Sequence, residues 1–329
     1  MIAVVKAEGY GHGALPVAQA ALEAGAWGLG VSTPDEAALL RPLTADDRIL
    51  VMGGLAPADA AGAAACGCAV MCHTIEMADA LEAAAPEGRR IPVHLKVDTG
   101  MGRLGCSPEE APGLARRIAD SARLRLAGTF THFASADADA EFTGSQFSLF
   151  VQVLDALGVN PGLRHAANSA ATLRHPEMAL DAVRCGISVY GCEDGRLRPA
   201  LALRALVTQV KQIPTGAGVG YGLTWRAERP TSLATVAIGY EDGILRSRGN
   251  RGDVIVRGRR APLVGRVSMD AITVDVTGVE GVRAGDVATL IGGDGQESIS
   301  AEEVAEWSGT ISYEVLTAIG GRVERRYSE

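Results

Sequence analysis

Short apolar runs alternate with Ala/Leu/Glu-rich segments through about residue 190. Eight runs have the composition of buried strands: residues 2–7, 27–33, 48–54, 69–74, 91–99, 124–133, 163–169 and 182–188. The segments between them, such as 15–24, 34–40 and 108–119, are typical of helices. Near-continuous apolar strands that alternate with helices indicate a parallel sheet covered on both faces. Eight of them favour a closed α/β architecture, a (β/α)8 TIM-like barrel, over an open doubly wound sheet.

The pattern changes after about residue 199, where short strands separated by glycine turns follow one another. We expect strands at residues 233–240, 253–257, 262–268, 271–276 and 286–291. One helix interrupts them, because Ser300 and Glu303 have the spacing of a capping box and Gly309 can end the helix. The sequence therefore predicts two domains, a barrel over residues 1–198 and a smaller, mainly antiparallel β domain over residues 199–329.

Composition and charge exclude several classes of protein. The chain has 329 residues, of which 47% are hydrophobic, and this is enough for about two globular domains. A net charge of −8 argues against a nucleic-acid partner. We expect no membrane association, since no apolar run reaches about 18 residues and the start lacks the basic region of a signal peptide. Six cysteines scattered through a long chain fit reduced thiols, which favours a cytoplasmic protein.

Lysine is scarce in this chain. Of 31 basic residues only Lys6, Lys96 and Lys211 are lysines, and arginine cannot replace a lysine where a neutral amine must form. Lys6 ends an apolar strand and is followed by a glycine-rich stretch, so in a barrel its side chain would point into the active-site mouth. Partial desolvation there would lower its pKa and make it a nucleophile for a Schiff base. The alternative is an ordinary lysine in a tight turn.

Other polar residues also stand at the ends of the expected barrel strands. Asp98, His132, Asn168 and Arg184 each follow or end an apolar run. The C-terminal ends of barrel strands are where active sites are built, so we expect these side chains to lie around one site. For His132 alone, a buried structural histidine is the simpler interpretation.

Two further patterns do not support a ligand site. Cys66-x-Cys68-x3-Cys72-His73 lacks a distant partner pair and lies beside an apolar strand, where cysteine behaves as a small hydrophobic residue. The glycines at residues 216, 218 and 220 lack the strand-then-helix setting of a dinucleotide loop. We therefore expect no metal site and no dinucleotide.

The stretch Val-Lys-Ala-Glu-Gly-Tyr-Gly-His-Gly at residues 5–13 resembles the pyridoxal-phosphate lysine motif of alanine racemases. Segments that resemble the family's other signatures follow in order at residues 94–105, 131–137, 167–170, 184–187, 219–222, 238–243, 265–270 and 311–315. The resemblance covers essentially the whole chain. In that family a strand and a helix normally precede the lysine strand, whereas five residues precede Lys6 here. Either the chain as numbered starts at a downstream methionine or the protein is naturally short.

The resemblance implies a pyridoxal-phosphate enzyme that interconverts L- and D-alanine and supplies D-alanine for bacterial peptidoglycan. Lys6 would hold the cofactor and act as one catalytic base, and Tyr221 would be the opposite base. Two bases suit racemisation, because a proton leaves one face of Cα and another returns to the opposite face. Free tyrosine has a pKa of about 10, so it needs help near neutral pH, and the family pattern assigns that help to His132 and Arg184.

The resemblance also assigns binding roles. Arg184 would meet the pyridine nitrogen and keep it unprotonated, which weakens the electron sink and suppresses side reactions such as transamination. Arg103 would contact the phenolic oxygen of the cofactor and the substrate carboxylate, and Met269 and Tyr240 would contact the substrate. Lys96 resembles a lysine that is carbamylated in many family members, and an ordinary Lys96–Asp98 pair is the alternative. The remaining cofactor contacts would be His132, Asn168 and the phosphate-binding Tyr10, Ser169, Gly186, Ile187 and Tyr313.

Three other functions would use a similar barrel and differ in the residues that they require. A non-catalytic pyridoxal-phosphate carrier shares the barrel and the lysine but lacks the second domain. A barrel decarboxylase of basic amino acids would need a cysteine acid in the β domain and a carboxylate at the position of Arg184. A racemase of serine or a basic amino acid remains open, because its chemistry is the same. The resemblance further implies a homodimer in which Tyr221 and Met269 of one chain complete the site around Lys6 of the other.

Overall fold

The computed structural model describes residues 1–328, with every side chain among them except that of Asp46. Its contacts divide the chain into two compact units. The first, the barrel unit, comprises Met1–Gly9 and Gly13–Val189, and the second, the β unit, comprises Tyr10–His12 and Tyr190–Glu329. None of the helices within residues 1–328 combines the length and the apolar character that a membrane span requires.

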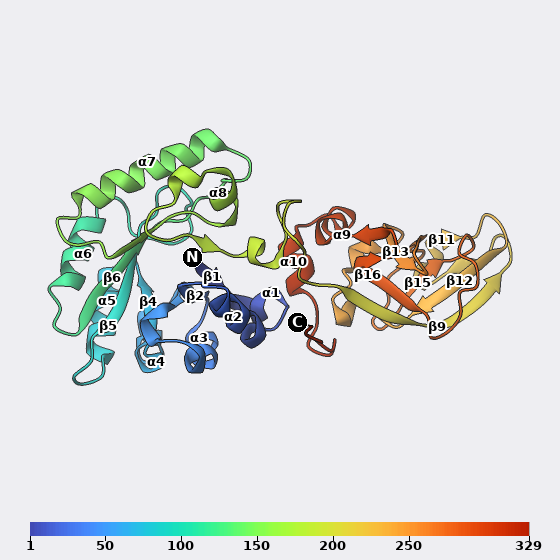
Figure 1. The fold of residues 1–329 in the computed structure, drawn as a ribbon, viewed down its shortest axis with the longest axis horizontal. Coiled ribbons are helices and arrows are strands. Elements are labelled where there is room, and N and C mark those ends of the chain that lie inside the picture. Colours follow the sequence, from blue (N-terminus) through green and yellow to red (C-terminus); the bar gives the residue numbers. More distant parts are fainter. Residues whose placement is uncertain (329) are drawn as a thin grey trace. The chain divides into compact units, whose positions relative to one another are not determined.

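The barrel unit is built on eight parallel strands in the order β7-β6-β5-β4-β3-β2-β1-β8 (Figure 1). They are β1 (Ile2–Val4), β2 (Gly28–Val31), β3 (Ile49–Val51), β4 (Ala69–Cys72), β5 (Ile91–Lys96), β6 (Leu124–Phe130), β7 (Leu163–His165) and β8 (Arg184–Cys185). An isolated parallel bridge between His165 and Ala182 joins the two ends of this order, and the Arg184 N–H donates to the Ala167 carbonyl at 2.8 Å. The predicted barrel is therefore confirmed, with strands shorter than the apolar runs.

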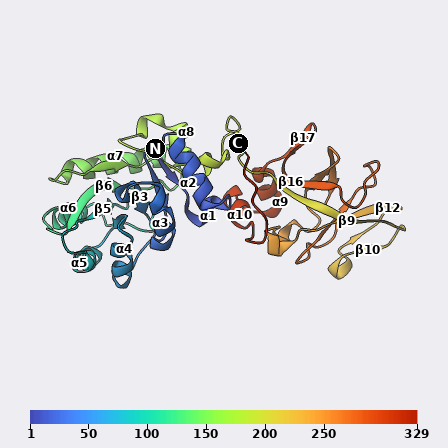
Figure 2. The ribbon, with the colours of Figure 1, turned by 60° about the horizontal axis from the view of Figure 1, so that its bottom comes forward.

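Helices follow the strands and cover the outside of the sheet (Figure 2). They are α2 (Ala14–Glu23), α3 (Pro34–Leu40), α4 (Ala60–Cys66), α5 (Ile75–Ala84), α6 (Ala111–Ala119), α7 (Ala140–Ala156) and α8 (Ser169–Arg174). The segment labelled α1 (Lys6–Tyr10) is a turn with left-handed backbone angles and not a regular helix. The helices expected at residues 15–24, 34–40 and 108–119 correspond to α2, α3 and α6. Thr33 and Glu36 form a capping box at the start of α3, which explains why the helix begins at that point.

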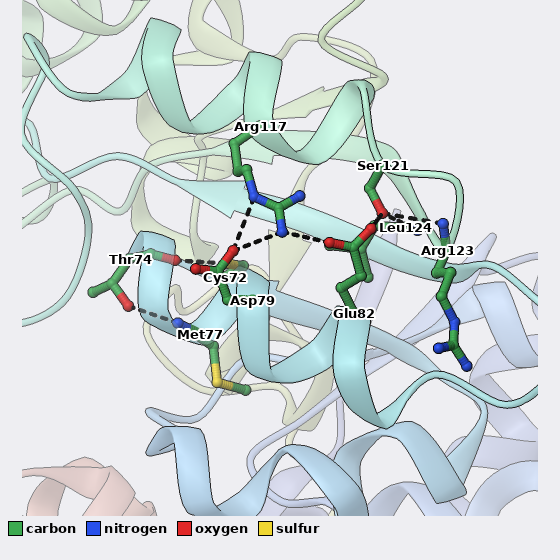
Figure 3. A network of polar contacts seen from close by, with 9 residues as sticks. All are labelled: Cys72, Thr74, Met77, Asp79, Glu82, Arg117, Ser121, Arg123 and Leu124. Carbon is green, nitrogen blue, oxygen red and sulfur yellow. Dashed lines mark hydrogen bonds and ion pairs between the residues drawn. The ribbon is translucent and has the colours of Figure 1, made fainter.

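A polar network fastens α5 to the end of α6 (Figure 3). Arg117 on α6 donates to Asp79 at 2.9 Å and also to Glu82, both on α5. Glu82 accepts a further hydrogen bond from the Ser121 hydroxyl, whose oxygen accepts the N–H of Leu124 at 3.0 Å. These contacts join two helices to the first residue of β6 and so fix the wall of the barrel beneath β5 and β6.

The β unit contains a seven-stranded sheet whose main path is β14-β13-β16-β9-β12-β15, with β17 paired to β16, and a separate hairpin of β10 and β11. The strands are β9 (Leu203–Ile213), β10 (Gly218–Val219), β11 (Trp225–Arg226), β12 (Thr231–Val236), β13 (Asp253–Val256), β14 (Arg259–Pro262), β15 (Ile272–Asp275), β16 (Val287–Asp294) and β17 (Glu297–Ile299). Every pairing in this unit is antiparallel. A bridge between Leu263 and Val274 links the two ends of the main path.

Three expectations about the β unit need correction. The long strand β9 was not expected, although its buried and exposed positions partly alternate, as they do in a half-buried strand. Residues 263–268 do not continue β14 and make only the bridge at Leu263. The expected helix is α9 (Ala301–Ser308) with its capping box at Ser300, but a second one, α10 (Ser312–Thr317), follows it. Its N-cap residue, Ile311, provides no side-chain cap, so the sequence carried no start signal for α10.

Residues Tyr10–His12 belong to the β unit because its C-terminal residues hold them. Arg325 donates to the Gly11 carbonyl at 3.2 Å, and the Tyr327 hydroxyl donates to the His12 carbonyl at 3.0 Å. Gly11 has a φ of +79°, and a Cβ there would lie 2.1 Å from the Leu316 carbonyl oxygen. Only glycine fits this position, which accounts for one glycine of the motif that follows Lys6.

Candidate active site

The turn after Lys6 has an unusual backbone. Ala7, Glu8 and Gly9 have φ values of 52°, 54° and 58°, which is the left-handed region that non-glycine residues avoid. The Glu36 carboxylate stabilises this turn, since it accepts the Ala7 N–H at 2.8 Å and the Ser32 N–H at 2.7 Å. A strained turn that is held by a carboxylate from a neighbouring helix is typical of functional sites.

Lys6 carries its amine at the start of this turn, and only Val5 separates it from the C-terminal end of β1. The residue as a whole is exposed, yet the atoms around its amine remove water from it. This desolvation and, after it, the positive charge of Arg103 lower the pKa of Lys6, while Glu36 acts in the opposite direction. A lower pKa increases the fraction of neutral, nucleophilic amine.

Arg184 is the most fully anchored side chain of the barrel mouth. It is 3% exposed, and its guanidinium donates to three carbonyl oxygens: Thr131 at 2.6 Å, His165 at 3.0 Å and Ala166 at 3.0 Å. Burial lowers the pKa of Arg184 to about 9, so the group keeps its charge at neutral pH. Carbonyl groups at or just beyond the ends of β6 and β7 thus hold the positively charged guanidinium of Arg184 in one orientation.

Three histidines depend on this arginine. Arg184 lies 2.8 Å from Nδ1 of His165 and 3.1 Å from Nδ1 of His132. Arginine can only donate, so both Nδ1 atoms accept and the ring protons of both histidines lie on Nε2. Nε2 of His165 lies 2.9 Å from Nδ1 of His94, which therefore accepts as well. Burial, and then neighbouring cations, hold the pKa of all three histidines below the usual range, so they are neutral.

Lys96 adds a second amine to the same cluster. It is 4% exposed, its Nζ lies 5.5 Å from the centre of the Phe130 ring, and burial followed by the charges of Arg184 and Arg103 lowers its pKa to about 8. Asp98 partly opposes this shift. Its carboxylate oxygens accept backbone N–H groups instead, from Gly100, Met101 and Gly102, each at 2.9 Å.

The electrostatics of this part of the barrel unit are therefore cationic. Lys6, Lys96, Arg103 and Arg184 all lower the pKa of His132, which shows that their fields converge at its ring. Such a cluster attracts anions and disfavours a further cation. Phosphate and carboxylate groups are the ligands of small molecules that suit it.

Ser169 and Gly186 meet at the ends of β7 and β8. The Ser169 hydroxyl is buried and accepts the Gly186 N–H at 2.9 Å and the Ser188 N–H at 3.3 Å. Asn168 caps α8, since its side chain accepts the Ala171 N–H at 3.0 Å. Ile187 is buried next to Gly186. Hydroxyl and N–H groups gathered at one place are suitable donors for a phosphate.

Tyr10 and Tyr313 come together in the β unit. Their ring centres are 6.0 Å apart, and the ring centre of Tyr190 lies 4.9 Å from that of Tyr10. Burial raises the pKa of Tyr10 to about 12, so its hydroxyl stays protonated and can donate a hydrogen bond.

Tyr221, Tyr240 and Met269 lie on loops of the β unit and face solvent in the single chain. Tyr221 is 71% exposed and Met269 is 51% exposed. Met269 and Tyr240 are adjacent, because the Tyr240 N–H donates to Ser268 at 3.0 Å and the Glu241 N–H donates to Met269 at 3.1 Å. Exposed aromatic and methionine side chains of this size mark an interaction surface more often than a plain solvent face.

Sequence reasoning missed His165, His94 and Glu36. Both histidines lie inside apolar runs that were correctly predicted as strands, and a histidine inside a buried strand needs a hydrogen-bond partner. That requirement is the signal that could have identified them. No separate sign of a site role for Glu36 was present in the sequence, because the capping box of α3 already accounts for a glutamate at this position.

Comparison with known proteins gives one consistent family. Residues 1–194 match the family model "Alanine racemase, N-terminal domain" and residues 200–327 match "Alanine racemase, C-terminal domain". The alanine racemase of Desulfovibrio desulfuricans is 43% identical over an alignment of 338 positions, which spans 99% of this chain and 90% of that relative. The crystal structure of alanine racemase from Bacillus anthracis with bound L-Ala-P is 40% identical, with a TM-score of 0.89, over 98% of this chain and 86% of that one. The enzyme from a D-cycloserine-producing Streptomyces lavendulae is 38% identical, with a TM-score of 0.90, over 98% of this chain and 88% of that one.

Proposed function

The chain belongs to the alanine racemase family, and we propose that it interconverts L- and D-alanine with pyridoxal phosphate as its cofactor and two bases, Lys6 and Tyr221. Its product would supply D-alanine for peptidoglycan. We further propose that residues 1–198 bind the cofactor and that residues 199–329 contribute the second base. The observation that carries the proposal is the position of Lys6 just beyond β1, among the cations Lys96, Arg103 and Arg184, in a chain that belongs to this family.

The residues fit a phosphorylated aldehyde cofactor. Lys6 offers an amine whose pKa is already lowered. Ser169, Gly186 and Ile187 would bind a phosphate near the ends of β7 and β8, and the Gly186 N–H would then exchange its hydrogen bond to the Ser169 hydroxyl for one to the phosphate. Tyr10 and Tyr313 of the β unit add phenolic hydroxyls, His132 and Asn168 are further contacts of the cofactor, and Arg103 would meet both its phenolic oxygen and the substrate carboxylate. When bound, pyridoxal phosphate supplies an electron sink for negative charge at the Cα atom of an amino acid.

Arg184 would face the ring nitrogen of that cofactor. Three carbonyl oxygens hold its guanidinium in place, and its proton is never available for transfer at neutral pH. A fixed donor that stays protonated at neutral pH would leave the ring nitrogen without a proton. This limits the sink and favours return of the proton to Cα over loss of the amino group.

His132 would assist Tyr221 without taking up a proton. Because its Nδ1 accepts from Arg184, its Nε2 carries the hydrogen and can donate to a phenolate oxygen. The cations around His132 would stabilise the same phenolate. Lys6 would then exchange a proton with one face of Cα and Tyr221 with the other, which is what racemisation requires.

Tyr221 would reach the site from a second copy of the chain. Its 71% exposure, together with the exposed Met269 and Tyr240, supports a surface that another subunit covers. In a two-fold dimer the same contact would occur twice and produce two equivalent sites. Met269 and Tyr240 of that second copy would then contact the substrate.

Lys96 is the candidate for carbamylation. Its lowered pKa provides the neutral amine that reacts with carbon dioxide, and Asp98 is occupied by three backbone N–H groups. A carbamate would change this side chain from a cation to an anion next to Arg103 and Arg184, and so orient Arg103.

The test is a racemisation assay with a panel of amino acids in the presence of pyridoxal phosphate. We expect kcat/KM to be highest for L- and D-alanine, measured by chiral chromatography, with Lys6→Ala as the inactive control. Higher kcat/KM for serine or for lysine and arginine would instead support a racemase of those amino acids. No racemisation of any of them would contradict the proposal.

A further inference from the structure

Arg322 joins the two loops of the β unit that carry Tyr240 and Met269. Its Nε donates to Oδ1 of Asp242 at 2.6 Å, and its Nη2 donates to Oδ2 of Asp242 at 3.1 Å and to Oδ1 of Asp270 at 2.7 Å. Asp242 ends the short 3-10 turn that begins at Tyr240, and Asp270 directly follows Met269. One guanidinium therefore bridges both loops.

The backbones of these two loops are in direct contact. A Cβ at Gly239 would lie 2.3 Å from the carbonyl oxygens of both Ser268 and Met269, so this position requires glycine. The Tyr240 N–H donates to the Ser268 carbonyl at 3.0 Å, and the Glu241 N–H donates to the Met269 carbonyl at 3.1 Å. Hydrogen bonds between loops that lie outside regular structure open easily unless other contacts hold the loops together.

Asp242 is the fixed end of the bridge. It is buried, its Oδ2 accepts the Gly239 N–H at 2.8 Å, and its carbonyl accepts the Gly320 N–H at 3.1 Å. Burial acts to raise the pKa of Asp242, but the hydrogen bonds from Arg322 and Gly239 outweigh it and hold this pKa below its usual value. Asp242 is therefore an anion at neutral pH and anchors Arg322.

Asp270 is the exposed end of the bridge. Its side chain is 66% exposed and that of Arg322 is 47% exposed. An ion pair this open to water contributes little to the stability of a fold. What the contact does provide is a link between the residue next to Met269 and a guanidinium that is anchored elsewhere. Its consequence is therefore the place of Met269 and not the survival of the β unit.

We propose that Arg322 is a positioning residue of the active site, which holds Tyr240 and Met269 at the mutual spacing that substrate binding requires. The inference rests on the proposed function, in which these two residues contact the substrate. Arg322 acts through Asp242 and Asp270 and takes no part in proton transfer. Arginine suits this role because its planar group can donate to two carboxylates at once, whereas lysine offers a single ammonium.

Hydrogen–deuterium exchange tests the positioning without an assay of activity. Asp270→Ala frees the loop of Met269 from Arg322 and changes an exposed side chain, so the protein should fold. Exchange at the N–H groups of Tyr240 and Glu241, followed by mass spectrometry of a peptide that contains both, should become at least about fivefold faster, because these groups donate to the freed loop.

Arg326→Met is the matched control. Arg326 lies on the same C-terminal segment and also forms an ion pair, with Glu324 at 2.8 Å, but that partner is only two residues away along the chain. The substitution removes the same charge and leaves the bridge between the two loops intact. Exchange at Tyr240 and Glu241 should therefore equal that of the parent protein.

Kinetics test the consequence for the substrate. KM for alanine should rise about tenfold in Arg322→Met and in Asp270→Ala, whereas kcat should change by less than about twofold, because a binding contact is misplaced and the two bases are not. Arg322→Lys should give an intermediate KM, since an ammonium can still pair with one carboxylate. The double variant Arg322→Met/Asp270→Ala should have the KM of Arg322→Met alone, because both changes break one link.

Three results would overturn the proposal: unchanged exchange in Asp270→Ala, faster exchange with an unchanged KM, or an equal rise of KM in Arg326→Met. If Arg322→Met does not fold because the buried Asp242 loses its partner, Asp270→Ala decides the question. A parent chain that racemises no amino acid would contradict the proposed function, whereas exchange in Asp270→Ala would still decide whether Arg322 holds the two loops.

Discussion

Nη1 of Arg184, a member of the cationic cluster around His132, lies 2.8 Å from Nδ1 of His165. This contact sets the direction of a hydrogen-bond chain, since Arg184 donates to His165 and His165 then donates to His94 at 2.9 Å. Both imidazoles must be neutral for the chain to exist. The arginine and the two buried histidines therefore form one unit, and the charge of that unit is confined to Arg184.

The first prediction concerns pH and stability. Burial lowers the pKa of His94 to about 3, against about 6.5 in the unfolded chain. Between these two pH values the unfolded state therefore binds more protons than the folded state, so the free energy of unfolding rises with pH. The contribution of the neutral His94 to stability is complete above about pH 6.5 and is lost as the pH falls toward 3. His94→Gln keeps an acceptor for His165 and removes this titration. Between pH 6 and 4.5, we expect the free energy of unfolding to fall less steeply in this variant, by up to about 1.4 kcal/mol per pH unit.

Urea unfolding at a series of pH values measures this slope. His165 remains in the variant, so some pH dependence should persist. Identical slopes for the variant and the parent protein would show that His94 is protonated in the folded state, and the hydrogen-bond chain would have to be abandoned.

A second prediction concerns Arg184→Glu. A carboxylate at this place would allow the ring nitrogen of pyridoxal phosphate to be protonated, which strengthens the electron sink. We expect racemisation to fall by at least about 100-fold and transamination to appear, measured as pyruvate formed from alanine. The substitution also removes three hydrogen bonds from a charged donor, so a lower unfolding temperature is expected as well. A folded variant without increased transamination would contradict the role given to Arg184.

A third prediction separates the two bases. Tyr221→Phe removes the phenolic oxygen from a 71% exposed side chain, so the fold should be unaffected. Exchange of the Cα proton with solvent should slow for the L-enantiomer much more than for the D-enantiomer, because only one face of Cα loses its base. NMR in deuterated buffer measures both rates, and circular dichroism controls for folding. Equal slowing of both enantiomers would remove Tyr221 from a face-specific role.

The fourth prediction tests whether sites are shared between chains. Lys6→Ala and Tyr221→Phe chains should each be nearly inactive alone. In a mixed dimer with shared sites, one site collects both lesions and the other has neither. Random exchange makes about half of the dimers mixed, so roughly a quarter of the parent activity should return. If both residues act within one chain, mixing restores nothing, and mass measurement must show that dimers are present.

The sequence predicted those features that follow from local pattern. Apolar runs with polar ends placed Lys6 and His132 just beyond strand ends, and the capping box at Ser300 located α9, whereas Arg184 is the first residue of β8 and not its end. The ordered motifs identified the family, which the comparisons confirm. The predicted strands were too long. The strand expected over residues 182–188, for example, is β8 (Arg184–Cys185), and the residues after it form a 3-10 turn.

What could not be predicted depends on contacts between distant residues. The neutral state of His165 follows from its position between Arg184 and His94, which are 19 and 71 residues away along the chain. Arg248 has the sequence context of an exposed turn, and only the packing of Trp307 shows that it is buried. No pattern of hydrophobicity contains this information, because burial of a charged residue is a tertiary effect.

Borohydride reduction tests the central claim most directly, since it fixes a Schiff base between pyridoxal phosphate and the lysine that holds it. The purified chain is incubated with the cofactor, reduced, digested and mapped by mass spectrometry. The lowered pKa of Lys6 and its place at the end of β1 predict a pyridoxyl label on Lys6, with no label in Lys6→Ala. A label on Lys96 or Lys211, or no label at all, would contradict the account.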